Sequence, residues 1–190
     1  ADGITTLSDF SVVAAARAAD ARGLPGPGVG AARRSRDKVA QRRAYAGAGL
    51  AGPRFAAVRT DADLAGFYAD DPGACVLKPA DSAGSAGVHV VDSLDEAIAA
   101  LPAALRWSFD GTCVIEQRLH GTELSVEGWV RDGEVTIAAV TRKTLLPGTF
   151  VEQQHLQPAG TGPEVGVLVR AAVRAMDLRT STFHAEVMMT

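Results

Sequence analysis

The chain has 190 residues, of which 47% are hydrophobic and 22% charged, and its formal net charge is −3 at pH 7. This composition is typical of a globular protein and excludes a disordered tail, a collagen-like fibre and a small disulfide-stapled protein. The mild acidity argues against a nucleic-acid binder that depends on bulk charge, and no apolar run approaches the roughly 18 residues of a membrane span. Only Lys38, Lys78 and Lys143 are lysines among the 19 basic residues. Since Arg is the usual cation of this chain, each of the three lysines indicates a candidate position for a specific function of lysine.

The first third of the sequence predicts helices separated by loops. A helix is expected over residues 8–22, where Ser8 or Asp9 can cap it, and a loop over residues 23–30, where Gly and Pro exclude regular structure. Further on we expect a helix over 36–49 capped by Ser35, a strand at 54–58, and a helix over 61–69 capped by Thr60. The basic clusters at 33–36 and 42–43 are interpreted as solvated helix faces.

The remainder of the sequence predicts paired strands with helices between them. Strands are expected at 75–79 and 87–91, which form a hairpin, and at 113–117, 122–130, 134–143 and 182–190. Helices are expected over 94–101, with Ser93 and Glu96 as a capping pair, and over 163–178, whereas residues 145–162 are predicted to be irregular. Cys75 and Cys113 each open an apolar run, which favours buried free thiols and leaves a disulfide as the alternative. This order predicts an α+β fold rather than regular βαβ winding.

A loop of small residues follows Lys78, with the sequence Pro-Ala-Asp-Ser-Ala-Gly-Ser-Ala-Gly. Small side chains let backbone N–H groups approach a phosphate, and the lysine supplies a positive charge beside them. The loop joins strand to strand, so it is neither a Walker loop nor a dinucleotide fingerprint. A mobile hairpin tip with an incidental lysine is the alternative.

Carboxylates at strand ends form two further candidate sites. Glu116 ends one predicted strand and Glu123 opens the next, and carboxylates suit ribose hydroxyls because each accepts two hydrogen bonds. In the last strand, alternation places His184 and Glu186 on one face, and an inward-facing Glu186 would need a partner such as Mg²⁺. Solvated surface glutamates are the alternative at all of these positions.

In their order and spacing, these stretches resemble the ATP-grasp superfamily, and most closely its carboxylate–amine ligases, such as the bacterial L-amino-acid (dipeptide) ligases. The matching stretches span nearly the whole chain: GLPG, RDKVAQRRAYAGAGLAGPRF, CVLKPADSAGSAGV, CVIEQRLHGTELSVEG, TRKTLLPGTFVEQQHLQPA and FHAEVMMT. The resemblance implies an ATP-grasp fold of antiparallel sheets with helices, incomplete at both ends. It implies the tail of an N-terminal domain at 1–30, a small ATP-grasp subdomain at 31–110, and a truncated large subdomain at 111–190.

The resemblance also implies roles for the three lysines and the loop. Lys38 and Lys78 match the family's two nucleotide-contacting lysines, and Lys143 lies where several relatives carry a phosphate-contacting cation. The flexible loop that closes over the β- and γ-phosphates corresponds to Gly84, Ser85 and Gly87.

Further implied roles concern the adenine, the ribose and the metal. The adenine-contacting hinge corresponds to Glu116 and to the backbones of Gln117 and Leu119. Glu123 matches the carboxylate that binds the ribose hydroxyls, and Glu186 matches the first Mg²⁺-binding carboxylate. In addition, Glu152 and His155 lie in a loop that the family places near the active site, which makes them candidates for substrate contact.

The activity implied by the resemblance is that of a cytoplasmic, ATP- and Mg²⁺-dependent ligase that forms C–N bonds. ATP would activate a small-molecule carboxylate as an acyl phosphate, and an amine would displace the phosphate. The two substrates would be amino acids, although ligases of the D-alanine–D-alanine type and of the purine pathway stay open as alternatives. We expect no nucleic acid or membrane as a partner, and the chain could form a homodimer. The family's Glu-x-Asn-x-Arg run is absent up to Thr190, so we expect this segment alone to bind ATP poorly and to show little or no ligase activity, whereas the full parent would be active. The alternative is a non-catalytic nucleotide-binding or interaction module that lacks the second metal-binding strand.

Overall fold

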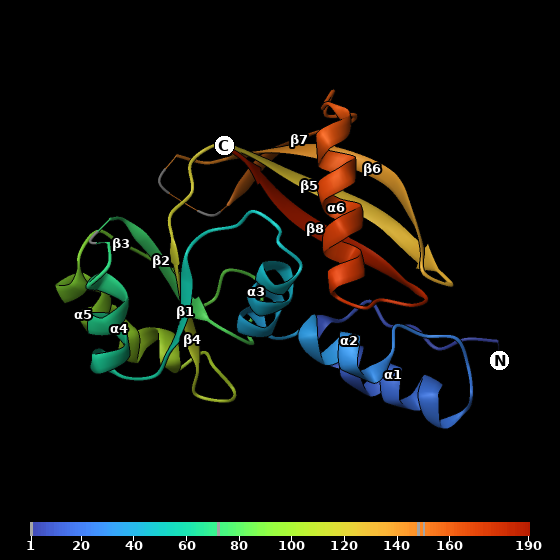
Figure 1. The fold of residues 1–190 in the computed structure, drawn as a ribbon, viewed down its shortest axis with the longest axis horizontal. Coiled ribbons are helices and arrows are strands. Elements are labelled where there is room, and N and C mark those ends of the chain that lie inside the picture. Colours follow the sequence, from blue (N-terminus) through green and yellow to red (C-terminus); the bar gives the residue numbers. More distant parts are fainter. Residues whose placement is uncertain (1, 72, 148, 150) are drawn as a thin grey trace. The chain divides into compact units, whose positions relative to one another are not determined.

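The computed structural model describes residues 2–71, 73–147, 149 and 151–190 and divides into two compact units (Figure 1). The central unit comprises residues 34–46 and 51–118, and the terminal unit comprises residues 1–33, 47–50 and 119–190. Each unit has one antiparallel four-stranded sheet with helices, which confirms the predicted α+β class. Among the described helices, none combines the length and the apolar character needed to cross a bilayer.

The central unit is built on a sheet with the strand order β1-β4-β2-β3. Its elements are α3 (Lys38–Gly47), β1 (Phe55–Val58), α4 (Asp61–Tyr68), β2 (Cys75–Pro79), β3 (His89–Val91), α5 (Leu94–Leu105) and β4 (Cys113–Gln117). The predicted hairpin of β2 and β3 is present, with Cys75 opposite Val91. Thr60 caps α4 in a capping box with Asp63, and Ser93 Oγ accepts from the Glu96 amide at the start of α5.

The alternation of side chains gives the central sheet two different faces. Cys75, Leu77, Cys113 and Ile115 pack with α4 and α5 on one face, and both cysteines are free and buried, as predicted. On the other face, Val114 packs with Val39 of α3. Because side chains alternate along a strand, Lys78 on β2 and Glu116 on β4 share the face that carries α3.

The terminal unit is built on a sheet with the strand order β7-β6-β5-β8. Its elements are η1 (Asp9–Ser11), α1 (Val12–Ala21), α2 (Val29–Arg34), β5 (Thr122–Arg131), β6 (Glu134–Leu145), β7 (Glu152–Leu156), α6 (Pro163–Ala175) and β8 (Ser181–Met189). The predicted turn joins β5 to β6 through Asp132 and Gly133, which have φ angles of 52° and 83°. Positive φ at both central residues is the conformation that a tight two-residue hairpin requires.

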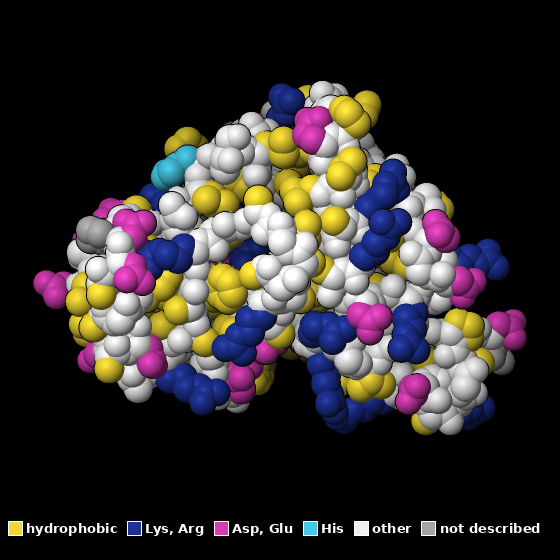
Figure 2. Space-filling model, in the orientation of Figure 1, with side chains coloured by type: hydrophobic (Ala, Val, Ile, Leu, Met, Phe, Trp, Pro, Cys, Tyr) yellow, Lys and Arg dark blue, Asp and Glu magenta, His cyan; other side chains and the backbone are white. Residues whose placement is uncertain are grey.

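Helix α6 covers one face of the terminal sheet. Val165, Val169 and Val173 recur every four residues and pack with Leu124 and Val126 of β5, which places the apolar stripe of the helix on the sheet. The outward side of α6 also carries apolar side chains at the molecular surface (Figure 2). The polar residues that alternate with Leu124 and Val126 on β5 therefore lie on the face that α6 does not cover.

Four predictions about local structure were wrong, of which the first two concern the start of a helix. Helix α2 begins at Val29, inside the predicted loop, where Ala31 and Ala32 become fully buried. Helix α3 is capped by Asp37, whose Oδ1 accepts from the Val39 and Ala40 amides, rather than by Ser35.

Helix α5 continues past Pro102 to Leu105, because the packing of the buried Leu101 and Ala104 outweighs the single hydrogen bond that proline removes. The stretch predicted to be irregular contains β7, which pairs with the edge of β6.

Candidate functional site

A buried ion pair joins the two candidate residues of the central sheet. Glu116 lies opposite Val76, and Lys78 lies opposite Val114, so the two side chains are diagonal neighbours on one face. Lys78 Nζ is 2.7 Å from Glu116 Oε2, and the Glu116 side chain is only 6% exposed. A buried carboxylate requires such a partner, because an unpaired charge in the interior is strongly unfavourable.

A second cation reaches the same carboxylate from α3. Arg42 Nε donates to Glu116 Oε1 at 2.7 Å, and Arg42 Nη2 donates to Glu116 Oε2 at 3.2 Å. Arg42 lies four residues after Lys38, so the two share a face of the helix. The interpretation of residues 42–43 as a solvated face was therefore wrong for Arg42, because alternation on β4 brings Glu116 under the helix.

The start of α3 holds the beginning of the glycine loop in place. Lys38 Nζ donates to the Ser82 carbonyl at 2.6 Å and the Lys38 amide donates to the Ala80 carbonyl at 2.9 Å. Arg36 Nη2 donates to the Asp81 carbonyl at 2.8 Å. The loop after Lys78 thus starts from a fixed backbone beside two cations.

The tip of the loop takes a conformation that glycine favours. Gly84, Ser85 and Gly87 have φ angles of 64°, 57° and 72°, and Gly84 and Ser85 are exposed. A Cβ added at Gly87 would lie 2.9 Å from Pro79 Cγ and 3.0 Å from Cβ and Cδ1 of Trp107. Small residues are required here both for the backbone conformation and for the close approach of the indole.

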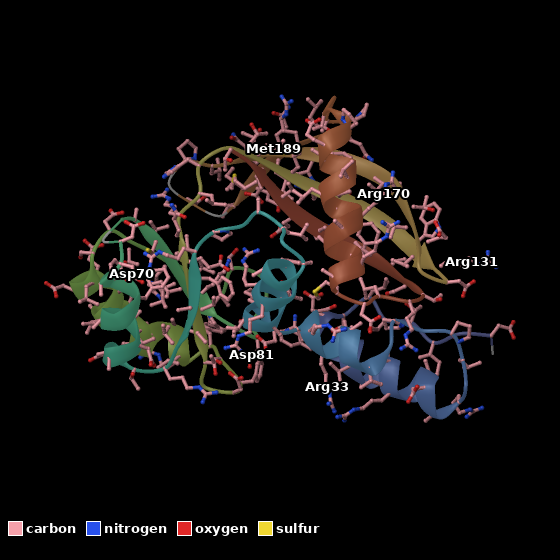
Figure 3. All side chains as sticks on the ribbon, viewed as in Figure 1. Arg33, Asp70, Asp81, Arg131, Arg170 and Met189 are labelled. Carbon is pink, nitrogen blue, oxygen red and sulfur yellow. The ribbon has the colours of Figure 1, made fainter. Side chains whose placement is uncertain are left out.

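Asp81 anchors the loop on its other side (Figure 3). Its Oδ2 accepts from the amides of Phe109 and Asp110, each at 3.0 Å, and its Oδ1 accepts from Ser108 Oγ at 3.0 Å. The segment after α5 is thereby tied to the base of the glycine loop.

The charges of the central site shift the ionisation of its members. Burial and the neighbouring charge of Lys78 lower the pKa of Lys38. Burial opposes ionisation of Glu116, but Lys78 and Arg42 outweigh it and hold the pKa of Glu116 below its usual range. At the base of the loop, Arg36 and Lys38 bind backbone carbonyls, and Lys78 and Arg42 bind Glu116. These four cations outnumber the three carboxylates of this region, Asp81, Asp110 and Glu116, which leaves an excess of positive charge beside the loop.

The predicted adenine hinge begins at the end of β4 with Glu116 and Gln117 and continues beyond the strand to Leu119. The Gln117 amide donates to the Arg54 carbonyl at 2.9 Å and the Arg118 amide donates to the Ala74 carbonyl at 2.9 Å, so neither amide is free for a ligand. Leu119 is half-buried and belongs to the terminal unit.

One ammonium group gathers three carboxylates in the terminal unit. Lys143 Nζ is 2.8 Å from Glu152 Oε1, 2.8 Å from Glu186 Oε1 and 3.6 Å from Glu123 Oε1. The Lys143 side chain is 2% exposed. Although burial opposes it, hydrogen bonds to Glu152 and Glu186 raise the pKa of Lys143 above its usual range.

Two histidines extend this group at its ends. His155 Nε2 is 2.5 Å from Glu152 Oε2, and His184 Nδ1 is 3.0 Å from Glu127 Oε1. His184 and, against the effect of burial, Lys143 lower the pKa of Glu186 to about 2. The Glu186 side chain is 62% exposed, which agrees with the alternative of a surface glutamate, because α6 covers the other face of the sheet.

The three carboxylates fit a hard divalent cation by donor type. One oxygen from each of Glu123, Glu152 and Glu186 lies within 4.8 Å of the others, and oxygen ligands are those that Mg²⁺ prefers. In this structure, the ammonium group of Lys143 neutralises part of the negative charge of these three carboxylates. Sequence reasoning named Glu186 alone as a metal ligand and treated Glu152 as a candidate for substrate contact.

Comparisons with known proteins identify the family of the chain. A family model described as "ATP-grasp domain" matches residues 72–190. Alanine–anticapsin ligase of Bacillus subtilis (strain 168) is 28% identical over 213 residues, an alignment that covers 98% of this chain and 45% of the relative. D-alanine–D-alanine ligase of Cupriavidus necator is 31% identical over 160 residues, covering 78% of this chain and 48% of the relative.

A solved structure is similar over the whole chain. The crystal structure of L-amino acid ligase from Bacillus licheniformis superposes with a TM-score of 0.77 at 26% identity, covering 99% of this chain and 45% of that chain. The chain spans about half the length of the curated relatives it matches.

Proposed function

This chain belongs to the ATP-grasp domain family, and from that premise we propose that it is the ATP-binding part of a carboxylate–amine ligase. In the proposed reaction, a carboxylate oxygen attacks the γ-phosphorus of ATP to give an acyl phosphate and ADP. The amine then attacks the acyl carbon, phosphate leaves, and the amine loses a proton as the C–N bond forms. The substrates are a small carboxylic acid and a small amine, both amino acids by analogy with the relatives.

The observation that carries the proposal is the positive charge beside the glycine loop. Lys78 comes directly before this loop, Lys38 donates to the Ser82 carbonyl within it, and Arg36 donates to the Asp81 carbonyl. Together with Arg42, which shares Glu116 with Lys78, these side chains leave the site with net positive charge. A polyphosphate is the ligand that such a combination of cations and small residues suits. Phosphoryl transfer requires mainly positioning and neutralisation of charge, which is what these side chains can supply.

In the central unit, we assign the phosphates to the lysines and the loop. Lys38 and Lys78 would contact the phosphates, and Gly84, Ser85 and Gly87 would close over the β- and γ-phosphates and exclude water. Exclusion of water matters because an acyl phosphate hydrolyses readily. The adenine would be bound by Glu116 and by the backbones of Gln117 and Leu119; because the Gln117 amide is engaged, the carbonyl of that residue is the group we assign to the adenine.

In the terminal unit, we assign the ribose to Glu123 and a divalent cation to Glu186, with Glu152 as a further candidate ligand. Mg²⁺, when bound, neutralises phosphate charge and polarises the transferred group. Lys143 holds the three carboxylates together and is the candidate for a phosphate contact when the nucleotide is present. The three segments 1–30, 31–110 and 111–190 remain our proposed division of the chain.

A non-catalytic nucleotide-binding module is the second candidate. It is favoured by one observation: Lys143 already balances the carboxylates that a metal would use. A ligase and a module would both bind nucleotide, but only the ligase would release phosphate in the presence of both substrates.

The proposal is tested by titrating the chain with ADP and Mg²⁺ in a calorimeter. We expect weak binding by the wild type, as predicted for this segment alone, and a further loss of at least about tenfold in affinity for K78M, since charge-assisted contacts to phosphate are strong. R106M is the matched control, because Arg106 is an exposed cation at the end of α5 in the same unit. Absence of ADP binding by the wild type would overturn the proposal. Phosphate release that depends on ATP, an amino acid and a second amine, measured on the full-length parent protein, then distinguishes the ligase from the module.

A further inference from the structure

We propose that Arg42 is a positioning residue of the nucleotide site: by binding Glu116 at two points, it leaves Lys78 free to be shared with a phosphate. The inference rests on the proposed nucleotide binding and adds a residue to which neither the family match nor the relatives assign a role.

The contact between Arg42 and Glu116 has the geometry of a two-point clamp. Two nitrogens of the guanidinium group meet the two oxygens of the carboxylate at 2.7 and 3.2 Å. The Glu116 side chain is 6% exposed and the Arg42 side chain is 30% exposed. Paired contacts of this kind fix the plane of the carboxylate, which a single ammonium cannot do.

The same carboxylate oxygen serves both cations. Glu116 Oε2 accepts from Arg42 Nη2 and lies 2.7 Å from Lys78 Nζ. Because Arg42 already compensates the buried negative charge, Lys78 can turn one N–H to another acceptor without leaving Glu116 unpaired. Without Arg42, Lys78 would be the principal partner of a buried carboxylate and would be held there, because breaking such a pair is strongly unfavourable.

The next residue in the chain provides a matched control. Arg43 follows Arg42 on the same helix but is exposed, because consecutive helical residues point about 100° apart. R42M and R43M therefore remove the same charge from the same helix, and only R42M removes the contact with Glu116.

The experiment measures the affinity of the chain for ADP with Mg²⁺ in five variants. We expect R42M to bind about tenfold more weakly than the wild type, because it removes one partner of the buried Glu116, and R43M to stay within about twofold, because it removes an exposed charge. Glu116 is itself assigned to the adenine, so E116Q alone is the reference for the double variant. R42M/E116Q should bind within about twofold of E116Q, since Arg42 has no carboxylate to hold in that background. R42K keeps the charge without the two-point contact, so its loss should be about threefold.

A pH series separates positioning from a general structural effect. The charged groups that face Glu116 are Arg42 and Lys78, with Lys38 close by. In R42M, protonation of Glu116 at acidic pH should release Lys78 and restore affinity relative to R43M. Each value is compared with R43M at the same pH, so that protonation of ADP itself cancels.

Equal affinities of R42M and R43M would overturn the inference and leave the proposed function intact. An R42M loss that is as large in the E116Q background as in the wild type, or that low pH does not restore, would also overturn it, because Arg42 would then not act through Glu116. Absence of ADP binding by the wild type would remove the proposed function and the inference together. If R42M does not fold, R42K and R42M/E116Q carry the same comparison.

Discussion

Lys143 on β6 and Glu186 on β8 meet at 2.8 Å although they are 43 residues apart and β5 lies between their strands. The same ammonium contacts Glu123 on β5 and Glu152 on β7. A single side chain of β6 therefore links the other three strands of the terminal sheet.

Removal of this ammonium should destabilise the chain. K143M leaves three carboxylates close together without a cation, and we expect the free energy of unfolding to fall by about 2 kcal/mol. This is less than for a fully buried pair, because Glu152 and Glu186 remain accessible to water. Chemical denaturation measures the change. T144M, at the next and exposed position of β6, should change stability by no more than about 0.5 kcal/mol, and an equal loss in both variants would contradict the prediction.

Two glycines of the phosphate loop should differ in their tolerance of alanine. G84A meets only the strain of its positive φ, since nothing lies within 4 Å of an added Cβ, and should cost about 1 kcal/mol. G87A has the same strain and also overlaps Pro79 and Trp107, so we expect a cost of about 3 kcal/mol. Denaturation of both variants checks the order, and the prediction fails if G84A proves the more harmful.

Loss of the Asp81 carboxylate should loosen the loop at its base. D81A removes the acceptor of the Phe109 and Asp110 amides, which should cost about 1–2 kcal/mol because water can replace it in part. Hydrogen exchange should become faster at these two amides and remain unchanged in β1. D70A, at an exposed position on the same unit (Figure 3), serves as the control and should leave all of these rates as they are.

Acid should weaken the central unit through Glu116. Its pKa is lower in the folded chain than in the unfolded one, where it is about 4.3, because Lys78 and Arg42 outweigh burial. The stability that follows from this difference is fully present above the unfolded value and is lost as the pH falls through the folded value. The free energy of unfolding should therefore fall on the acid side, and it should fall less in E116Q. A wild-type curve that matches E116Q at every pH would contradict this assignment.

Much of the architecture follows from local sequence patterns. Alternation in CVLKP and CVIEQ is sufficient to place Lys78 and Glu116 on the same face, once the two strands are neighbours. The Asp132–Gly133 turn fixes the pairing of β5 and β6. These features depend on residues close in the chain, whose conformations are restricted by sterics and by the period of the strand.

Other parts of the site depend on tertiary contacts that no local pattern reports. Arg42 and Arg43 are the same residue type at adjacent positions, and only the packing of α3 on the sheet decides that Arg42 meets Glu116. Strand β7 is exposed at every position, so it lacks the alternation that identifies a half-buried strand. Lys143 and its three carboxylate partners come from all four strands of the terminal sheet. Their spacing in the sequence does not predict that they lie close together.

Because Trp107 lies close to Gly87, it can serve as an intrinsic fluorescence probe of the glycine loop. The chain contains two tryptophans, Trp107 in the central unit and Trp129 in the terminal unit, and Trp107 is 57% exposed where its indole meets the loop. Replacement of Trp129 by phenylalanine leaves a single fluorophore at the loop stem. Its emission wavelength and its quenching by iodide would then report the closure that we propose for the loop, in real time and without an added label.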